Sequence, residues 1–274
     1  IHDINTVRRH ISTLKGGRLV QLCQARSILS LIISDVPGNF LPDIASGPTV
    51  ADPTTFQDAI NAMRQYGVWD HAPRRVKDHL IRGHLGKIPE TPKPGNQEFK
   101  RVHNVIVADN AIACSAAAKA LSTNHSKATI LTSRAEIEAS QMGRFLAAIA
   151  TDRTRQPFRV GSILIGGETT VLVRGDGVGG RNQETALSAV EDIAGTDGVV
   201  VAAIGTDGID GNSNAAGAIV DGRTSERAKK KGLLVNDYLV RNDSYHFFHA
   251  LNDNLITGRT GTNVGDVYLT VRIN

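Results

Sequence analysis

Apolar residues along the chain follow two patterns, and their order predicts an α/β protein. Short apolar runs alternate with segments of helical periodicity, and this alternation predicts βαβ units around a parallel sheet. The run 27–34 is almost wholly apolar, which predicts a strand buried on both faces of that sheet. Further strands are predicted at 102–108 and 128–132, and helices at 5–14, 18–26, 55–66, 73–83, 110–122 and 135–151.

The pattern changes after Pro157, and a domain boundary is expected between residues 152 and 161. The runs 162–165 and 169–174 predict two strands close enough to form a hairpin. Residues 266–273 alternate strictly between apolar and polar, which predicts a half-exposed antiparallel strand. Further strands are predicted at 199–204 and 218–220, and helices at 182–193, 224–231 and 244–251.

Composition and charge exclude several classes of protein. With 41% hydrophobic and 21% charged residues, the chain has the composition of a folded protein. Its 31 basic and 27 acidic residues are scattered, so no nucleic-acid-binding patch is expected. No apolar run reaches the ~18 residues of a membrane span. Cys23 and Cys114 are expected as reduced thiols of a cytoplasmic protein. The start at Ile1, without Met, indicates a processed, truncated or incompletely represented chain.

Four loops begin where a predicted strand ends, which is where open α/β sheets bind ligands. The first loop follows the 27–34 strand and carries Ser34 and Asp35, with Ser46 and Thr49 shortly after it. Asp35 is a candidate to hold a metal or orient a hydroxyl, and the two later hydroxyls are candidates to contact phosphate. A rigid turn whose Asp caps backbone amides explains the same residues equally well.

The second loop, 175–180, satisfies the spacing G-x-G-x-x-G. A dinucleotide site is therefore considered, but the preceding run 169–174 is short and polar-flanked, unlike the buried first strand of that motif. A glycine-rich loop entering a helix also presents backbone amides to an anion. Arg181, expected in an exposed first turn, adds a planar cation for a carboxylate or phosphate. The alternative is that the glycines serve only a tight connection.

The third loop, 205–212, places Asp207 and Asp210 directly after a predicted buried strand. Two carboxylates on a tight loop suit a hard cation that holds phosphate oxygens, and Asx turns without metal are the alternative. The fourth loop, 257–263, combines small residues, hydroxyls and one arginine as an anion cradle or a plain turn. Lys15 is either an anion ligand or an exposed helical side chain.

Nine short motifs stand in order along nearly the whole chain. They are INTVRRH at 4–10, LKGGRL at 14–19, SDVPG at 34–38, ASGPT at 45–49, GGETTV at 166–171, GGRNQE at 179–184, GTDGIDG at 205–211, NDSY at 242–245 and TGTNV at 260–264. Together they resemble the glycerate 2-kinase family. Its carboxy-terminal module is called the MOFRL domain, and some of its members carry the name hydroxypyruvate reductase.

The resemblance implies a two-domain α/β architecture. It implies a Rossmann-like parallel-sheet domain at 1–157, a smaller α/β domain with a mixed sheet at 158–274, and an active-site cleft between them. Family members extend well upstream of Ile1, over a glycine- and serine-rich phosphate loop and a lysine. The amino-terminal part of the first domain is therefore expected to be missing from this chain.

The resemblance also implies an activity and the residues that carry it. It implies a cytoplasmic, ATP-dependent and Mg²⁺-requiring kinase that phosphorylates D-glycerate to 2-phosphoglycerate by in-line transfer. No nucleic-acid or membrane partner is implied, and a homodimer is left open. Arg181, Asp207 and Lys15 are the expected catalytic residues, and Asp207 and Asp35 the expected metal ligands. Substrate and nucleotide contacts are expected from Ser34, Asp35, Ser46, Gly47, Thr49, Gly179, Gly180, Asn182, Glu184, Thr206, Asp210, Thr260, Thr262 and Asn263.

Two other functions remain as alternatives. An NAD(P)-dependent hydroxypyruvate reductase would use 175–180 as its dinucleotide loop and Asp197 as its ribose-binding acid. A small-molecule-binding module would keep the fold without activity. The sequence does not decide which loop binds ATP and which binds glycerate.

Overall fold

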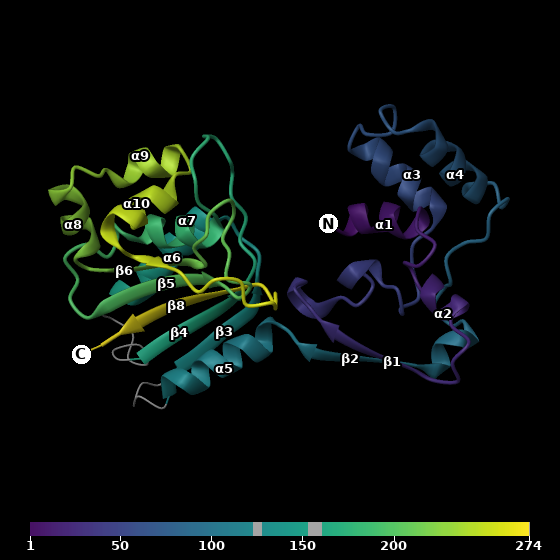
Figure 1. The fold of residues 1–274 in the computed structure, drawn as a ribbon, viewed down its shortest axis with the longest axis horizontal. Coiled ribbons are helices and arrows are strands. Elements are labelled where there is room, and N and C mark those ends of the chain that lie inside the picture. The colour runs from purple at the N-terminus through teal and green to yellow at the C-terminus, as the bar shows by residue number, and fades with distance from the viewer. Residues whose placement is uncertain (123–127, 153–160, 274) are drawn as a thin grey trace. The chain divides into compact units, whose positions relative to one another are not determined.

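The computed structural model describes residues 1–122, 128–152 and 161–273, and the chain divides into two compact units (Figure 1). The first unit comprises Ile1–Ile32 and Asn39–Val107, and the second comprises Ile33–Gly38 and Ala108–Asn274. The boundary expected between residues 157 and 158 lies outside the described residues and stays a prediction. No helix in the described ranges is long and apolar enough to cross a membrane.

Helices dominate the first unit and pack around a small apolar core. Its core includes Phe56, Met63 and Leu80, which are nearly or fully buried. A capping box between Thr55 and Asp58 fixes the start of helix α3 (Phe56–Gln65), because each side chain accepts a hydrogen bond from the other residue's backbone amide. The helices are α1 (His2–His10), α2 (Arg18–Leu22), α3 (Phe56–Gln65) and α4 (Arg74–His84), with short 3-10 turns at Ile44–Ser46 and Gln97–Arg101. A further 3-10 turn, Pro37–Asn39, begins in the second unit and ends in the first.

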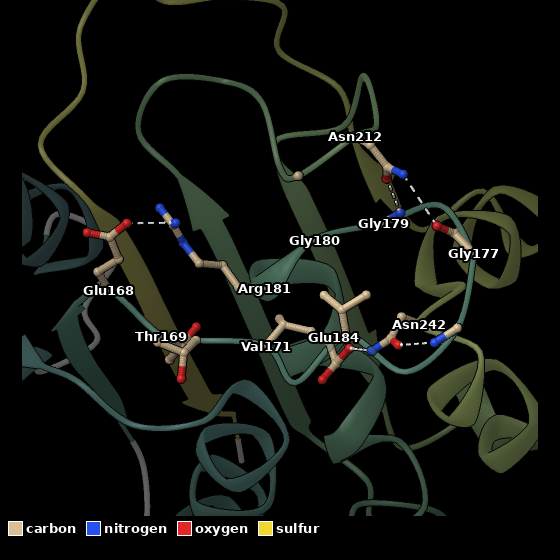
Figure 2. Close-up of a pocket in the computed structure, with 14 residues that line it drawn as sticks. Glu168, Thr169, Val171, Gly177, Gly179, Gly180, Arg181, Glu184, Asn212 and Asn242 are labelled. Atoms are coloured by element: carbon tan, nitrogen blue, oxygen red, sulfur yellow. Dashed lines mark hydrogen bonds and ion pairs between the residues drawn. The ribbon is translucent and has the colours of Figure 1, made fainter. Parts of the chain in front are cut away.

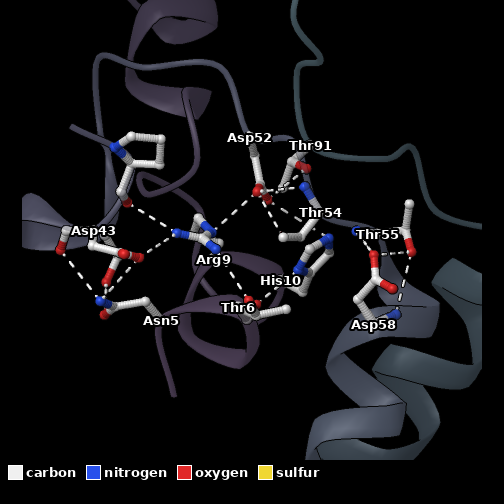
Figure 3. Close-up of polar contacts among 12 residues, drawn as sticks. Asn5, Thr6, Arg9, His10, Asp43, Asp52, Thr54, Thr55, Asp58 and Thr91 are labelled. Carbon is white, nitrogen blue, oxygen red and sulfur yellow. Dashed lines mark hydrogen bonds and ion pairs between the residues drawn. The ribbon is translucent and has the colours of Figure 1, made fainter. Parts of the chain in front are cut away.

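A buried ion-pair network joins α1 to two loops of the first unit (Figure 3). The Arg9 guanidinium lies 3.1 Å from an Asp43 oxygen through Nη1 and 3.1 Å from an Asp52 oxygen through Nε. All three side chains are at most 3% exposed. Buried charges persist only when they are paired, so this network fixes both loops against the helix.

The strand predicted at 27–34 forms, but it is not buried on both faces. Strand β1 (Ile28–Ile33) belongs to a two-stranded sheet with β2 (Val102–Ala108) in the described residues. Its burial alternates, and Leu29 and Leu31 are 64% and 65% exposed. The prediction was wrong because an apolar run does not reveal whether a second layer covers the strand.

A mixed six-stranded sheet organises the second unit, which confirms the α/β class. The strand order is β3, β4, β8, β5, β6, β7, and only the pair of β3 and β4 is parallel among the printed neighbours. The strands are β3 (Ala128–Ala135), β4 (Gly161–Gly167), β5 (Val199–Gly205), β6 (Gly217–Asp221), β7 (Asn254–Leu255) and β8 (Asp266–Arg272).

Helices cover both faces of this sheet (Figure 1). On one face α5 (Asn110–Ser122) places Cys114 against Leu164 of β4, and on the other face α6 and α7 bring Leu146 and Leu187 against the strands. Burial raises the pKa of the Cys114 thiol to about 11, so this free cysteine stays protonated at neutral pH. The remaining helices are α6 (Ala139–Thr151), α7 (Arg181–Ala189), α8 (Thr224–Lys230), α9 (Val235–Val240) and α10 (Ser244–Leu251).

Two strand predictions in this unit were wrong. Residues 169–174 form no strand apart from an isolated bridge between Thr170 and Glu138, so the expected hairpin is absent. The antiparallel neighbour of β4 is instead β8. Strand β8 is antiparallel as predicted, but its polar side is buried rather than exposed, because it lies between β4 and β5 under helices. Tyr268 and Thr270 on that side are 0% and 3% exposed.

Candidate active site

The candidate site lies at one end of the six-stranded sheet, where the last residues of β4 and β5 lie beside the first residue of β8. The register pairs Asp266, the first residue of β8, with Gly167 at the end of β4 and with Gly205 at the end of β5. The segments that follow these two strands therefore leave the sheet on either side of Asp266. Loops at the carboxyl ends of strands are the usual ligand sites of α/β sheets.

A pocket of about 560 Å³ opens beside this end of the sheet, and its volume is typical of small-molecule sites. Its walls come from the segment after β4, the glycine loop before α7, the first turns of α7, and the residues before α10 (Figure 2). Of the residues expected to bind ligands, Gly179, Gly180, Arg181 and Glu184 line it.

Arg181 is held at the pocket wall by two carboxylates. Its Nε and Nη2 donate to the two oxygens of Asp266 at 2.5 and 3.2 Å, a bidentate pair. Its Nη1 lies 2.7 Å from an oxygen of Glu168 (Figure 2). Arg181 is thus a partly buried, paired side chain and not the exposed first-turn arginine expected from the sequence.

The charges of this group shift one another's pKa values. Burial by itself lowers the pKa of Arg181, but the hydrogen bond and charge of Asp266 and the charge of Glu168 raise it above its ordinary value. Burial raises the pKa of Glu168, and although Arg181 opposes this, the charges of Asp266 and Asp35 add to the rise. Arg181 is therefore a permanent cation, while the Glu168 carboxylate is easier to protonate than an ordinary glutamate.

A second layer of buried polar groups supports Asp266 from behind. The Tyr268 hydroxyl lies 3.0 Å from an Asp266 oxygen and accepts a hydrogen bond from the backbone amide of Thr169 at 3.0 Å. Asn182 Nδ2 donates to the other Asp266 oxygen at 3.1 Å. Burial, followed by the charge of Asp266, raises the pKa of Tyr268, so the phenol stays neutral. These groups connect β8, the segment after β4 and α7.

The amides of the glycine loop are used within the fold. Gly175 donates to Asn242, Val178 donates to Asp243, and Gly179 donates to Asn212. No strand precedes the loop, because residues 171–174 have no regular structure. Both observations weigh against a loop that wraps a pyrophosphate.

Close packing explains why glycine is needed there. A side chain at Gly179 would begin 2.1 Å from the Ser244 hydroxyl, and one at Gly180 would begin 2.4 Å from the Asp210 carboxyl group. The loop therefore packs directly on the residues that begin α10 and on the loop after β5.

Asp210 caps the helix that begins at Arg181. Its two oxygens accept hydrogen bonds from the backbone amides of Asn182 and Gln183 at 3.0 and 2.8 Å, and from both of their side-chain amides. Asp210 is 2% exposed, and four donors occupy its oxygens. The helix N-terminus that was expected to meet an anion is thus capped by this carboxylate.

Glu184 supplies a second carboxylate to the pocket wall. It is 5% exposed, and Asn242 Nδ2 donates to it at 3.0 Å. Burial raises its pKa, and the Asn242 hydrogen bond only partly opposes this. Asn242 also accepts from the Arg174 and Gly175 amides, so it joins the glycine loop to α7.

A second group of predicted residues gathers in the neighbouring loops of the same unit. The Thr260 amide donates to the Asp207 carbonyl, and the Thr260 hydroxyl donates to the Thr206 carbonyl at 2.6 Å. Asn263 Nδ2 reaches an Asp35 oxygen at 3.5 Å. The Thr262 amide donates to the Thr260 hydroxyl, and Ser34 is buried, with its hydroxyl accepting from the Val36 amide.

The other predicted residues belong to the first unit. Lys15 Nζ donates to the Ala45 carbonyl at 2.8 Å, and Ser46 is buried and donates to Asn5 at 2.8 Å. The Thr49 hydroxyl donates to Asn104 at 2.6 Å. Gly47 takes a left-handed conformation at the end of its 3-10 turn, with its carbonyl accepting from Gly17. Lys15, Ser46 and Gly47 are thus brought to one turn, and their roles as ligand contacts stay predictions.

The expected metal ligands do not form a protein-only cage. Within the described residues no group of three or more His, Cys, Asp or Glu side chains is arranged to hold a metal ion. One Asp207 oxygen accepts from the Ile209 amide at 3.1 Å, as in an Asx turn. Asp207 and Asp35 therefore stay predicted ligands.

Four further residues line the pocket that the sequence did not single out as ligand contacts: Glu168, Thr169, Asn212 and Asn242. The motif Gly-Gly-Glu-Thr-Thr at 166–170 directly follows a predicted strand, and that position was the available signal for Glu168. Asn242 carried a weaker signal, since its contacts with the glycine loop depend on tertiary packing.

Comparison with known proteins agrees with the resemblance over the whole chain. The model of the MOFRL family matches residues 161–266, and a domain of unknown function, DUF4147, matches residues 1–81. The glycerate 2-kinase of Pyrococcus horikoshii is 42% identical over 99% of this chain and 61% of its own length. The glycerate kinase of Macaca fascicularis is 33% identical over 98% of this chain and 78% of its own length.

A solved structure supports the same conclusion. The crystal structure of glycerate kinase from Thermotoga maritima matches with a TM-score of 0.85 and 37% identity, covering 99% of this chain and 63% of that one. The chain is therefore a two-part α/β protein with a MOFRL module. It belongs to the glycerate kinase family. It spans about three fifths of the length of the first curated relatives it matches.

Proposed function

We propose that the protein containing this chain is an ATP-dependent kinase that phosphorylates D-glycerate to 2-phosphoglycerate. The relatives named glycerate kinase or glycerate 2-kinase supply the reaction class. The observation that carries the proposal is the partly buried Arg181 at the wall of a small-molecule pocket. D-glycerate is a small carboxylate, and a fixed guanidinium is the side chain best suited to bind such a group.

The chemistry asked of these residues is positioning and charge neutralisation. Phosphoryl transfer needs little covalent help from the protein, because charge develops mainly on the transferring oxygens. Arg181 binds the glycerate carboxylate or the transferring phosphoryl group in this proposal. Glu184 and Asn242, which are joined by a hydrogen bond, also line the pocket. Asp207 stays a proposed catalytic residue in the adjoining loop.

Mg²⁺ would be held by few protein ligands if it is the cofactor. In nucleotide sites this ion commonly takes one or two carboxylates, with phosphate and water oxygens completing its shell. Asp207 and Asp35 are the proposed carboxylates, and the ion would neutralise phosphate charge.

A hydroxypyruvate reductase is the second candidate function. A relative in Agrobacterium vitis carries a provisional name of that kind. It is 40% identical to this chain, and the match covers 60% of its own length. The glycine loop argues against it, because its amides bond within the fold and no strand leads into it.

The two functions are separated by paired assays on the protein as expressed from its gene. One assay follows ATP consumption with D-glycerate and identifies the product by ³¹P NMR, with Mg²⁺ present or chelated. The other follows NADH oxidation with hydroxypyruvate. We expect Mg²⁺-dependent formation of 2-phosphoglycerate. Oxidation of NADH without phosphorylation would establish the reductase instead.

A further inference from the structure

Arg181 has two carboxylate partners that differ in burial. Asp266 is 1% exposed and accepts from two nitrogens of the guanidinium. Glu168 is 41% exposed and pairs with the third nitrogen, Nη1. Both Arg181 and Glu168 line the pocket, so the contact between them faces the space a ligand would enter (Figure 2).

Asp266 is also fixed by groups other than Arg181. Tyr268 and Asn182 each place a polar atom near a different Asp266 oxygen, at 3.0 and 3.1 Å. Its backbone is paired on both sides, with Gly167 and Gly205. These contacts hold the Asp266 carboxylate in place independently of Arg181.

The two ion pairs therefore differ in what it costs to break them. Separating a buried pair leaves a charge without water or partner, which is strongly unfavourable. Separating a partly exposed pair costs little free energy, because water and ions replace the lost partner. On these grounds an incoming anion is expected to displace Glu168 from Arg181 and to leave Asp266 in place.

We propose that Asp266 is the fixed positioning residue of Arg181, and that Glu168 occupies the place on Arg181 that the anionic group of the ligand takes. The inference rests on the proposed function for the identity of that ligand, D-glycerate. Glu168 then lowers the affinity of the pocket for anions, because an anion must compete with its carboxylate for Arg181. Asp266 sets the orientation of the guanidinium during phosphoryl transfer.

The exchange is tested by Glu168→Gln, which keeps the shape of the side chain and removes its charge. Isothermal titration calorimetry with D-glycerate should show about two- to fivefold tighter binding than wild type, because the competing carboxylate is gone. The matched control is Glu191→Gln, an exposed acid that pairs with Lys229 away from the pocket lining. Unchanged or weaker binding in Glu168→Gln, with wild type binding D-glycerate, overturns the exchange.

The positioning role is tested by Tyr268→Phe, which removes only the hydroxyl beside Asp266 and Thr169. We expect kcat to fall about tenfold with little change in KM for D-glycerate, since one hydrogen bond to a charged group is lost behind Arg181. Asp266→Asn should lower kcat further if it folds. A Tyr268→Phe enzyme with wild-type kcat, or one whose KM alone rises, contradicts the role.

Failure of the proposed function can be told apart from failure of this inference. If wild type neither binds nor phosphorylates D-glycerate, the substrate assignment is wrong. Inorganic phosphate then serves as the probe, and Glu168→Gln should still bind it more tightly than wild type. Equal affinity in the two proteins, or no binding in either, overturns the exchange at Arg181.

Discussion

Glu184 lies in an environment that disfavours the charged form of its carboxyl group. It is 5% exposed, and burial raises its pKa despite the hydrogen bond from Asn242. A carboxyl group whose folded-state pKa lies above its unfolded value opposes folding once it ionises. The cost is absent below the unfolded pKa, near 4.5, and it grows as pH rises through the folded-state pKa.

Glu184→Gln should therefore gain stability relative to wild type as pH increases. The glutamine oxygen still accepts from Asn242, and no charge has to be buried. Thermal unfolding at pH 4 and at pH 8 measures the effect as the Tm difference between variant and wild type. We expect a larger difference in favour of the variant at pH 8. A difference that shrinks between pH 4 and pH 8 would show that the fold favours the ionised form.

At the residue scale the sequence identified the centre of the pocket better than the partners around it. Gly179, Gly180 and Arg181 were predicted because a glycine loop before a helix is a local feature. Asp210 caps α7, which spacing alone did not show, and its role as a ligand contact stays a prediction. Glu168 meets Arg181 only through the register of β4 and β8.

Among the structural elements, α1 depends on one buried guanidinium. Arg9 neutralises Asp43 and Asp52, and all three side chains are at most 3% exposed. Helix α1 also packs on α3, whose Phe56 belongs to the core of the first unit. The helix was predicted from its apolar spacing, but its attachment through a polar network has no periodic signal in sequence.

Arg9→Ala should destabilise the first unit by about 3–5 kcal/mol, because it removes the guanidinium that bridges two buried carboxylates and leaves them with weaker partners. Urea unfolding followed by circular dichroism measures the change. Arg74→Ala is the matched control, since Arg74 is 92% exposed and its pair with Asp78 spans one helical turn. We expect little effect from the control. Equal effects of the two substitutions would mean that the buried network contributes nothing to the fold.

Most helices and strands form close to their predicted ranges, and the exceptions share a cause. The segment 169–174, strand β1 and strand β8 were each assigned a wrong partner or a wrong burial. Local pattern fixes the type of an element, whereas its neighbours are set by tertiary contacts. In β8 one of the polar positions is Tyr268, whose hydroxyl forms a hydrogen bond with Asp266 inside the protein. The alternation of apolar and polar residues therefore did not indicate an exposed face.

For the whole molecule, the described pocket is built from the second unit alone. Every residue that lines it falls within Ala108–Asn274. Lys15, Ser46, Gly47 and Thr49 lie in the first unit, and their part in ligand binding stays a prediction. The chain spans about three fifths of its first listed relatives, so activity belongs to experiments on the protein as expressed from its gene.

Arg181 is the residue that we propose binds the anionic group on which the reaction depends. The most direct test of this role is the steady-state kinetics of D-glycerate phosphorylation by Arg181→Ala and Arg181→Lys, with each substrate varied separately. Arg181→Ala should lose about a hundredfold in kcat/KM, corresponding to roughly 3 kcal/mol of transition-state stabilisation.

Arg181→Lys separates charge from geometry in the same measurement. Lysine keeps the positive charge beside Asp266 but has no planar fork to bond Asp266 and a ligand together. We expect it to lose much of the activity, with circular dichroism confirming that both variants are folded. If folded Arg181→Ala retains near-normal kcat and KM for both D-glycerate and ATP, the pocket at Arg181 is not the active site.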